Sequence, residues 1–406
     1  MPSIPASSAR DDAAVIGLVG VAHCISHFSQ LLLPPLFPWL KDVFQVSYAE
    51  LGFLMTIFFV VSCAVQTTSG FLVDRHGPRP MLFGGLALIG VAALGFAAST
   101  SYGMLAFFAA VAGVGNGVFH PVDYTLLNRK VAPARLGHAF SVHGITGSLG
   151  WAIAPAVLVP LTIAFSWRVA LVCAAAIVAG VLAILWLNRS RLTIEPVAPR
   201  GTAAVKDAGG GFDFLRIPAV WVCFVFFLML AVVLSGVQSF APEAARQLHA
   251  VPASLAAICL SVYMLSSAGG MVIGGFLARD PSRCERIAGT AFGCASLIAL
   301  TLGFAELGAL AVPVLFGLMG VAAGIAGPSR DLIVKRASPE NATGRVYGVV
   351  YSGLDIGQAI APLVFGTLMD LHRPSDVWLG IALVQMVLVF TAFNVRRARR
   401  TVLAAA

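Results

Sequence analysis

Long apolar segments recur along the whole chain and restrict what it can fold into. Read with a window of about 19 residues, the sequence holds twelve segments of about the 20-residue length that crosses a bilayer. They are predicted near residues 13–36, 48–70, 80–98, 103–126, 137–162, 167–188, 218–242, 253–277, 287–306, 308–331, 344–371 and 375–395. With 59% hydrophobic residues, the chain has more apolar surface than one water-soluble core can bury. We therefore expect an all-α integral membrane protein that lies in a lipid bilayer.

Lysine and arginine are distributed unevenly between alternate loops. If both termini lie inside the cell, the outer loops hold only Lys41, Arg168, Arg246 and Arg373. Because cytoplasmic loops retain basic residues, we expect a multi-pass protein with both termini in the cytoplasm, and the Arg-rich usage favours a bacterial inner (plasma) membrane. The net charge of +8 is spread over many short loops and forms no basic stripe, so no nucleic-acid partner is predicted.

The longest polar interruption divides the apolar segments into six and six. Residues 189–217 are rich in Gly, Pro and Ala, a composition typical of a flexible linker. We therefore expect an N-terminal six-helix bundle over 1–188, a cytoplasmic linker over 189–217 and a C-terminal six-helix bundle over 218–406.

The two halves share an internal repeat. "GVGNGVFHP" and "GWAIAP" in the first half match "GVAAGIAGP" and "GQAIAP" in the second at a constant offset of 207 residues. The matching positions include Gly113, Gly117, Pro121, Arg129, Gly150 and Pro155 with Gly320, Gly324, Pro328, Arg336, Gly357 and Pro362. We interpret the halves as structural duplicates. Duplicated membrane bundles commonly bind a ligand between them, near the midplane of the bilayer.

The turn "GFLVDRHGPRP" gathers charge between two apolar segments, at Gly70, Asp74, Arg75, Gly77 and Arg79. These residues resemble the loop signature between helices two and three of the major facilitator superfamily, although Pro78 stands where a basic residue is usual. The resemblance covers essentially the whole chain, and it implies the two-bundle fold, a transport function and a gating role for this loop.

A narrower resemblance comes from "AHCISHFSQLLLPPLFPWLKDVF" and "GVFHPVDYTLLN", which are similar to the fosmidomycin-resistance-type branch of that superfamily. In that branch a histidine is commonly followed four residues later by an aspartate, and here His27 occupies the place of that aspartate. A proton or substrate role carried by the aspartate is therefore not transferred to this chain.

Two interpretations of the Asp74 loop stay open. In the first, the charges anchor the topology. In the second, Asp74 forms a breakable latch, since an acid gains nothing from the positive-inside bias. In the second interpretation Asp74 faces the positive end of the helix capped by Asn341 or Thr343, with Arg129 or Arg135 nearby. Such a contact contributes about 0.3–2 kcal/mol, which is small enough to break in every transport cycle.

Ionisable side chains inside apolar segments are rare and are candidates for function by default. His23, His27 and Gln30 share one face of the first predicted helix. Histidine changes its protonation near neutral pH, so these residues are candidates for substrate binding or proton coupling. The alternative is that the two histidines bond a neighbouring helix and serve packing alone.

The fourth predicted helix carries His120 and Asp123 one turn apart, and His143 in the fifth is expected to join them. Asp123 is either a proton site or the partner of Arg129 or Lys130 in a structural ion pair. Pro121 lacks an N–H, so it frees the carbonyl one turn earlier and can kink the helix.

The second half has different buried charges. Asp355 lies in the middle of the eleventh predicted helix, where the repeat places Ser148, and Gln358 follows on nearly the same face. Asp355 is a candidate proton carrier or partner of a cationic substrate, and the alternative is a hydrogen bond between helices.

No phosphate-binding loop of the form G-x-x-x-x-G-K-[ST] is present, so direct use of ATP is disfavoured. We therefore predict a secondary active transporter with proton-coupled efflux of a drug or metabolite. Proton-coupled uptake of a small organic anion is the alternative. The partners expected are a small-molecule substrate, protons and lipid. No enzymatic activity, cofactor or metal site is predicted, because no ligand set of recognisable spacing follows the histidines, and a monomer is expected.

Overall fold

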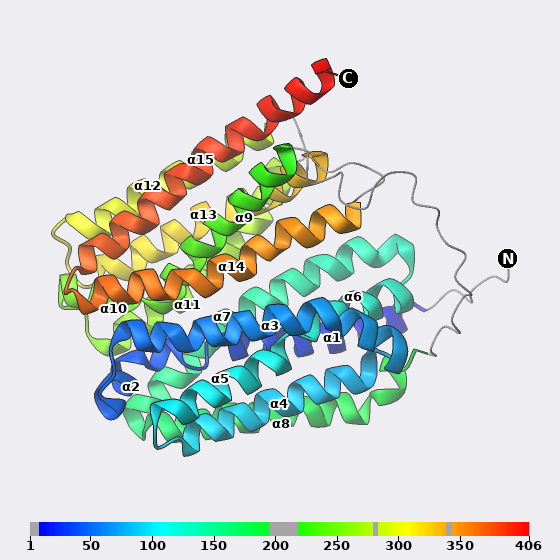
Figure 1. The fold of residues 1–406 in the computed structure, drawn as a ribbon, viewed down its shortest axis with the longest axis horizontal. Helices are drawn as coiled ribbons and strands as arrows, with labels where there is room; N and C mark the ends of the chain where they lie inside the picture. The colour runs from blue at the N-terminus through cyan, green and yellow to red at the C-terminus, as the bar shows by residue number, and fades with distance from the viewer. Residues whose placement is uncertain (1–7, 195–217, 279–282, 338–342, 406) are drawn as a thin grey trace, which may run out of the picture. The chain divides into compact units, whose positions relative to one another are not determined.

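The computed structural model describes residues 8–194, 218–278, 283–337 and 343–405 (Figure 1). Within these ranges the regular elements are helices, and 12 helical spans are long and apolar enough to cross a membrane. Six of these spans precede residues 195–217 and six follow them. The predicted all-α membrane fold with twelve spans is therefore confirmed. Most of the predicted linker lies outside the described residues.

The chain divides into two compact units. Unit 1 contains residues 1–45 and 57–200, and unit 2 contains residues 46–56 and 201–406. The helices before the linker are α1 (Ala9–Gln30), η1 (Pro34–Leu36), α2 (Phe37–Phe44), α3 (Tyr48–His76), α4 (Pro78–Ala98), α5 (Tyr102–Asn116), α6 (Phe119–Lys130), η2 (Pro133–Arg135), α7 (Leu136–Ala164), α8 (Trp167–Leu187) and η3 (Arg189–Leu192). Those after it are α9 (Pro218–Ser239), α10 (Ala241–His249), α11 (Ala253–Leu277), α12 (Cys284–Phe304), α13 (Ala311–Ala337), α14 (Thr343–Asp370) and α15 (Pro374–Ala405).

Serine residues set the start of several helices. The hydroxyls of Ser8, Ser101 and Ser166 accept hydrogen bonds from backbone N–H groups three residues later, at the first turns of α1, α5 and α8. Ser47 and Glu50 form a reciprocal capping box at the start of α3, with N–O distances of 2.7 and 3.1 Å. Each cap satisfies a backbone donor that the helix itself leaves unpaired.

Glycines allow close approach of helices in both units, at matching positions of the internal repeat. In unit 1, a Cβ on Gly113 or Gly117 would contact the carbonyl oxygens of Phe58 and Ser62 on α3, and one on Gly150 would overlap that of Cys24 on α1. In unit 2, Gly320 and Gly324 face the carbonyls of Tyr263 and Ser267 on α11 in the same way, and Gly357 faces that of Leu228 on α9. The repeat therefore preserves the same helix pairs, as expected for duplicated bundles.

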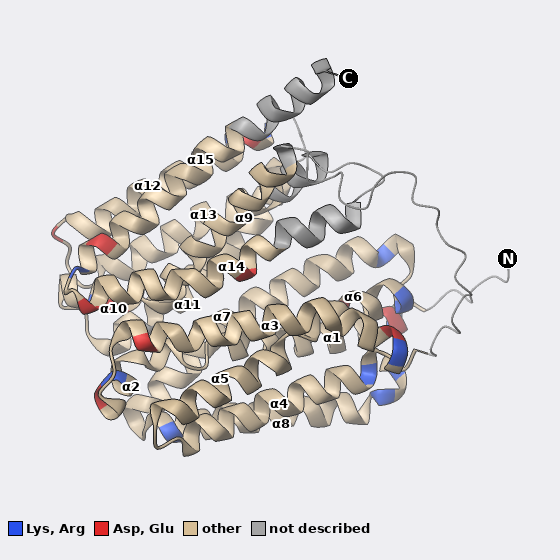
Figure 2. Cartoon of the chain, in the orientation of Figure 1, with Lys and Arg blue, Asp and Glu red and all other residues tan. Residues whose placement is uncertain are grey.

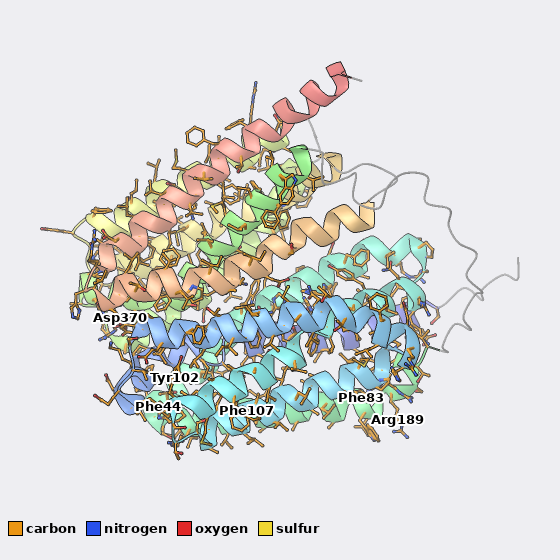
Figure 3. The ribbon with its side chains drawn as sticks, viewed as in Figure 1. Phe44, Phe83, Tyr102, Phe107, Arg189 and Asp370 are labelled. Carbon is orange, nitrogen blue, oxygen red and sulfur yellow. The ribbon has the colours of Figure 1, made fainter. Side chains whose placement is uncertain are left out.

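The surfaces of the helices are those of a protein that meets lipid. Most charged residues lie near helix ends (Figure 2). Large apolar side chains are exposed along the helices, including Phe107 on α5, which is 62% exposed (Figure 3). Such exposure would be unfavourable in water over so wide an area, but it suits a hydrocarbon environment.

Two polar contacts fix the ends of the helices in unit 1. Asp12 at the start of α1 is fully buried, and its Oδ2 accepts hydrogen bonds from Arg135 Nε (2.7 Å) and the backbone N–H of Ala132 (3.1 Å). Arg168 at the start of α8 donates to the carbonyl oxygens of Ala97 and Ser99 at the end of α4. Each contact therefore joins a helix end to a loop that follows a different helix.

Candidate functional site

A buried polar cluster lies where α1, α6 and α7 pack together in unit 1. Asp123 on α6 is its centre, and this residue is fully buried. Its Oδ2 accepts hydrogen bonds from Nδ1 of His23 on α1 (3.0 Å) and Nε2 of His143 on α7 (3.1 Å). The sequence predicted the approach of His143 to Asp123, and the structure adds His23, which the sequence had grouped with His27 and Gln30. The predicted ion pair of Asp123 with Arg129 or Lys130 is wrong, because α6 turns the carboxylate toward α1 and α7.

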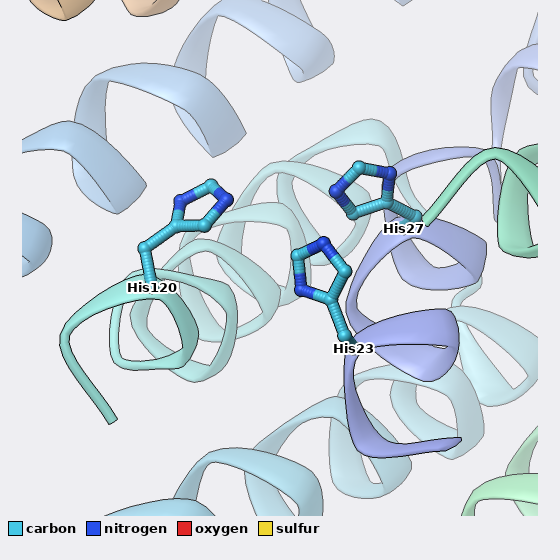
Figure 4. Close-up of side chains that lie close together, drawn as sticks. All are labelled: His23, His27 and His120. Carbon is cyan, nitrogen blue, oxygen red and sulfur yellow. The ribbon is translucent and has the colours of Figure 1, made fainter. Parts of the chain in front are cut away.

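His27 and His120 extend the cluster away from Asp123. The ring of His23 lies 4.4 Å from that of His27 and 5.5 Å from that of His120, measured between ring centroids. Figure 4 shows the three rings pointing toward one another from α1 and α6. Nδ1 of His120 lies 2.9 Å from Oε1 of Gln66 on α3. The cluster therefore joins four helices of unit 1.

The backbone around His120 explains how its side chain is placed. The predicted continuous helix over 103–126 is interrupted, because α5 ends at Asn116 and α6 begins at Phe119. Pro121 has no N–H for the carbonyl of Gly117, and this carbonyl instead accepts a hydrogen bond from the Ser69 hydroxyl at 3.3 Å. The sequence allowed a kink at Pro121, and the structure has instead an interruption of the helix one turn before the proline.

Asn116 is the centre of a second polar network beside the histidines. Its side-chain oxygen accepts hydrogen bonds from Ser26 Oγ (2.8 Å) and, more weakly, Gln30 Nε2 (3.5 Å). Its amide nitrogen donates to Ser62 Oγ at 2.9 Å. Gln30 also accepts a hydrogen bond from Trp151 Nε1 at 2.9 Å. The half-buried Asn116 therefore connects polar groups of α1 and α3, and Gln30 extends the network to α7.

Gln30 was predicted from the sequence, but Asn116, Ser62 and Trp151 were not, because uncharged side chains do not stand out in an apolar segment. One signal was available. Asn116, His120 and Asp123 repeat the i, i+4, i+7 spacing of His23, His27 and Gln30. Two helices with polar residues at the same spacing are expected to face each other in a membrane bundle.

The predicted site residues of unit 2 lie on α14. Asp355 is half-buried, and Gln358 is 8% exposed with an Oε1 that has no hydrogen-bond partner among the described residues. Gln238 on α9 and Gln385 on α15 are also buried, and each has side-chain atoms without a described partner. Among the described residues, the polar groups buried in unit 2 thus include three glutamines, whereas unit 1 buries two histidines, His23 and His143.

The predicted gating residues lie in two stretches of the chain. One stretch covers the end of α3 and the start of α4, and the other runs from the end of α6 to η2, just before α7. Asp74 and Arg129 are 4.0 Å apart, with side chains 75% and 41% exposed, so this pair contributes little to stability. Gly77 adopts a positive φ of 83° between α3 and α4, a conformation that glycine allows without strain. Arg135 bonds Asp12, and so it is not the partner of Asp74 that one interpretation offered.

The structure also describes the predicted gating residues Arg79, Arg75 and Gly70. Arg79 donates to Thr193 Oγ1 at 2.9 Å, Arg75 is exposed, and the position of a Cβ on Gly70 is open. Asn341, the first predicted cap of the opposing helix end, lies outside the described residues, as does the side chain of Thr343. The latch therefore stays a prediction.

Replacing Asp74 by asparagine tests the latch. We expect transport to fall by about two- to thirtyfold, the equivalent of 0.3–2 kcal/mol, while the amount of inserted protein stays unchanged. Asp42→Asn, at another exposed carboxylate, is the matched control. Initial rates in proteoliposomes measure the effect, and transport by Asp74→Asn at the wild-type rate would remove the latch.

Comparison with known proteins decides the family. The model of the Major Facilitator Superfamily matches residues 19–362. The chain belongs to this superfamily. Its fold is that of a bacterial homolog of the human lysosomal transporter Spinster, solved in an inward-facing and occupied conformation, with a TM-score of 0.75, 16% identity and coverage of 97% of this chain and 98% of that one. The family and the fold are those of membrane transporters.

Relatives by sequence include proteins named for drug resistance. The chain is 26% identical to the multidrug resistance protein MdtH of Escherichia coli O1:K1 / APEC over 355 residues, which is 82% of this chain and 83% of MdtH. It is also 26% identical to the fosmidomycin resistance protein of Escherichia coli K12 over 157 residues, 37% of this chain and 36% of that protein. The chain thus spans only about a third of the length of this second relative.

Proposed function

We propose that this superfamily member is a secondary active transporter that expels a small organic solute in exchange for protons, by alternating access. Its relatives' names support efflux, since they include fosmidomycin and multidrug resistance proteins. The observation that carries the proposal is the polar network around Asn116 in unit 1. Hydrogen-bonding groups from several helices meet there within spans that are otherwise apolar, which is the arrangement of a solute site.

The side chains of the network suit a neutral or weakly charged solute with hydrogen-bonding groups. Asn116 and Gln30 each offer a donor and an acceptor. The rings of Trp151 and His27, whose centroids are 4.2 Å apart, provide an aromatic wall beside them. We assign solute contact to His27, Gln30 and Asn116.

We assign proton coupling to Asp355, supported by Gln358, on α14. A carboxyl in the apolar part of a span is stable when protonated and becomes less favourable when charged, so it can exchange a proton as its surroundings change. Asp355 is half-buried, which leaves it accessible to such a change. The first-half repeat has Ser148 at this position, so this proton site would belong to unit 2 alone.

We also propose the orientation that the loop charges favour, with both termini in the cytoplasm of a bacterial cell, and a monomer as the working unit. In unit 1, Arg75, Arg79, Arg129 and Arg189 lie at the helix ends that this orientation places inside. The positive-inside bias supports the assignment. Labelling of single cysteines introduced at Arg168 and Arg189 from one side of the membrane tests it.

Transport in proteoliposomes tests the function. The purified protein is reconstituted, and uptake of a panel of small organic compounds, fosmidomycin included, is measured with the lumen acidic, alkaline or at equal pH. We expect at least one compound to accumulate when the lumen is acidic, as proton antiport requires. Accumulation that depends on an alkaline lumen would instead indicate symport. Uptake that does not depend on the pH gradient for any compound would overturn the proposal.

Replacing Asn116 by alanine tests the solute site. Loss of an amide that takes part in several hydrogen bonds is expected to weaken binding of the transported compound by about tenfold, since each bond contributes about 1 kcal/mol. Asn128→Ala is the matched control, because Asn128 is exposed and donates to the Tyr124 carbonyl of its own helix. Equal affinity for both variants would contradict the assignment.

A further inference from the structure

Three histidines in unit 1 place ring nitrogens around one point. His23 and His27 lie on α1 and His120 lies on α6, and one nitrogen of each ring is within 4.8 Å of the others (Figure 4). His23 is 2% exposed, and the other two are partly buried. Neither solute contact nor proton coupling, as assigned above, requires three imidazoles to converge in this way.

The hydrogen bonds made by His23 and His120 determine which ring nitrogen of each presents a lone pair. Nδ1 of His23 bonds the Asp123 carboxylate, and Nδ1 of His120 bonds the side-chain oxygen of Gln66. Because both partners are acceptors, each Nδ1 carries the proton and each Nε2 presents its lone pair. This is the arrangement of metal-binding histidines, whose second nitrogen usually donates to a carboxylate or a carbonyl oxygen.

His27 supplies the third nitrogen. Its Nδ1 is buried and has no hydrogen-bond partner among the described residues, which is unfavourable for a polar atom inside a span. Nδ1 of His27 and Nε2 of His23 both lie beside the missing side chain of Gly147, at 2.8 and 3.1 Å from the position that a Cβ would take. A larger residue at this position would push the two rings apart.

We propose that His23, His27 and His120 bind one divalent transition-metal ion of the zinc class, with Asp123 and Gln66 orienting the ligands and a fourth coordination position open. Imidazole nitrogens suit Zn²⁺, Co²⁺, Ni²⁺ and Cu²⁺, and three histidines with an open position form a known type of zinc site. The carboxylate of Asp123 lies one ring away and offsets part of the charge of the ion.

Binding requires only small movements of the rings. Nitrogens at the usual 2.0–2.1 Å from zinc are about 3.4 Å apart in a tetrahedral site, so the three rings must close in from their present spacing. The site departs from the sequence-based expectation of no metal. That expectation considered spacing along one helix, whereas His120 comes from a second helix. The metal site does not depend on the proposed transport function.

The experiment is a Co²⁺ titration of the purified, tag-free, metal-stripped protein in detergent, followed by visible absorption, with Zn²⁺ as competitor. We expect one equivalent of Co²⁺ to produce the absorption bands of a nitrogen-coordinated ion of low coordination number, and Zn²⁺ to remove them. Wild-type protein that shows no saturable binding of one equivalent at micromolar metal would overturn the proposal, without any variant being required.

Variants locate the ion. His27→Ala and His120→Ala, on different helices, are each expected to weaken Co²⁺ binding at least tenfold, and Asp123→Asn by about ten- to a hundredfold through its effect on His23. His138→Ala is the matched control, because His138 is exposed on α7. Thermal unfolding without metal identifies any variant that is misfolded. Unchanged affinity in folded His27→Ala and His120→Ala, or loss of binding in His138→Ala, would contradict the site.

Discussion

Replacing Asp355 by asparagine should reduce the accumulation of solute against its gradient by about a hundredfold or more, while the affinity for solute changes little. The amide keeps the shape of the side chain but cannot gain or lose a proton in the transport cycle. Between Arg345 and Asp370, α14 carries no acidic residue other than Asp355. A neighbouring carboxyl of the same helix therefore cannot replace it in the middle of the span.

The measurement separates coupling from recognition. Proteoliposomes with an acidic lumen report uphill accumulation, exchange of labelled solute at equal pH reports the solute-moving step, and equilibrium binding reports affinity. We expect Asp355→Asn to lose uphill accumulation and to keep both solute exchange and solute binding. Glu306→Gln, which changes an exposed carboxylate in the loop between α12 and α13, is the matched control. Uphill accumulation by Asp355→Asn at the wild-type level would move the coupling site elsewhere.

Replacing Gly150 by alanine should destabilise unit 1 far more than the same change at Gly144. Both glycines lie on α7, but a Cβ on Gly150 would overlap the Cys24 carbonyl oxygen and crowd His27 Cβ, whereas one on Gly144 would meet nothing within 4 Å. The overlapping atom belongs to the α1 backbone, so α1 and α7 must separate. Overpacking of this kind raises the free energy of the folded state by about 1–3 kcal/mol.

Thermal unfolding in detergent checks this prediction. Gly144→Ala should unfold at or above the wild-type temperature, because alanine favours a helix over glycine, and Gly150→Ala should unfold several degrees lower. Gly357→Ala repeats the experiment in unit 2, where the Cβ would contact the Leu228 carbonyl oxygen at 2.5 Å. Equal unfolding temperatures for Gly150→Ala and Gly144→Ala would show that this helix contact is looser than its geometry indicates.

The fold was predictable because membrane insertion depends on features that are local in the sequence. A span needs about 20 apolar residues, whatever surrounds it, and twelve such segments were found. The internal repeat added the pairing of helices, since Gly113 and Gly320 proved to face equivalent carbonyls. The sequence did not reveal the break between α5 and α6 at Gly117, because a helix interruption of two residues does not change the hydropathy of a segment.

The candidate site was predicted only in part. Spacing along α1 grouped His23 with His27, and His143 was correctly expected to approach Asp123. One of the two alternatives gave Asp123 the wrong partner, because it relied on the proximity of Arg129 in the sequence. The rotation of the helix about its axis decides which side chains a carboxylate contacts. Asn116 was missed for a related reason, since an amide becomes a network centre only through neighbours on other helices.

Asp12 has a practical consequence for work on this protein. It precedes the apolar part of α1, and it is buried and holds both Arg135 and the Ala132 backbone. Versions shortened at the amino end beyond this point would release the loop joining α6 to α7, which carries Arg135. A protein trimmed for crystallisation should therefore begin before Ser8, which caps the same helix.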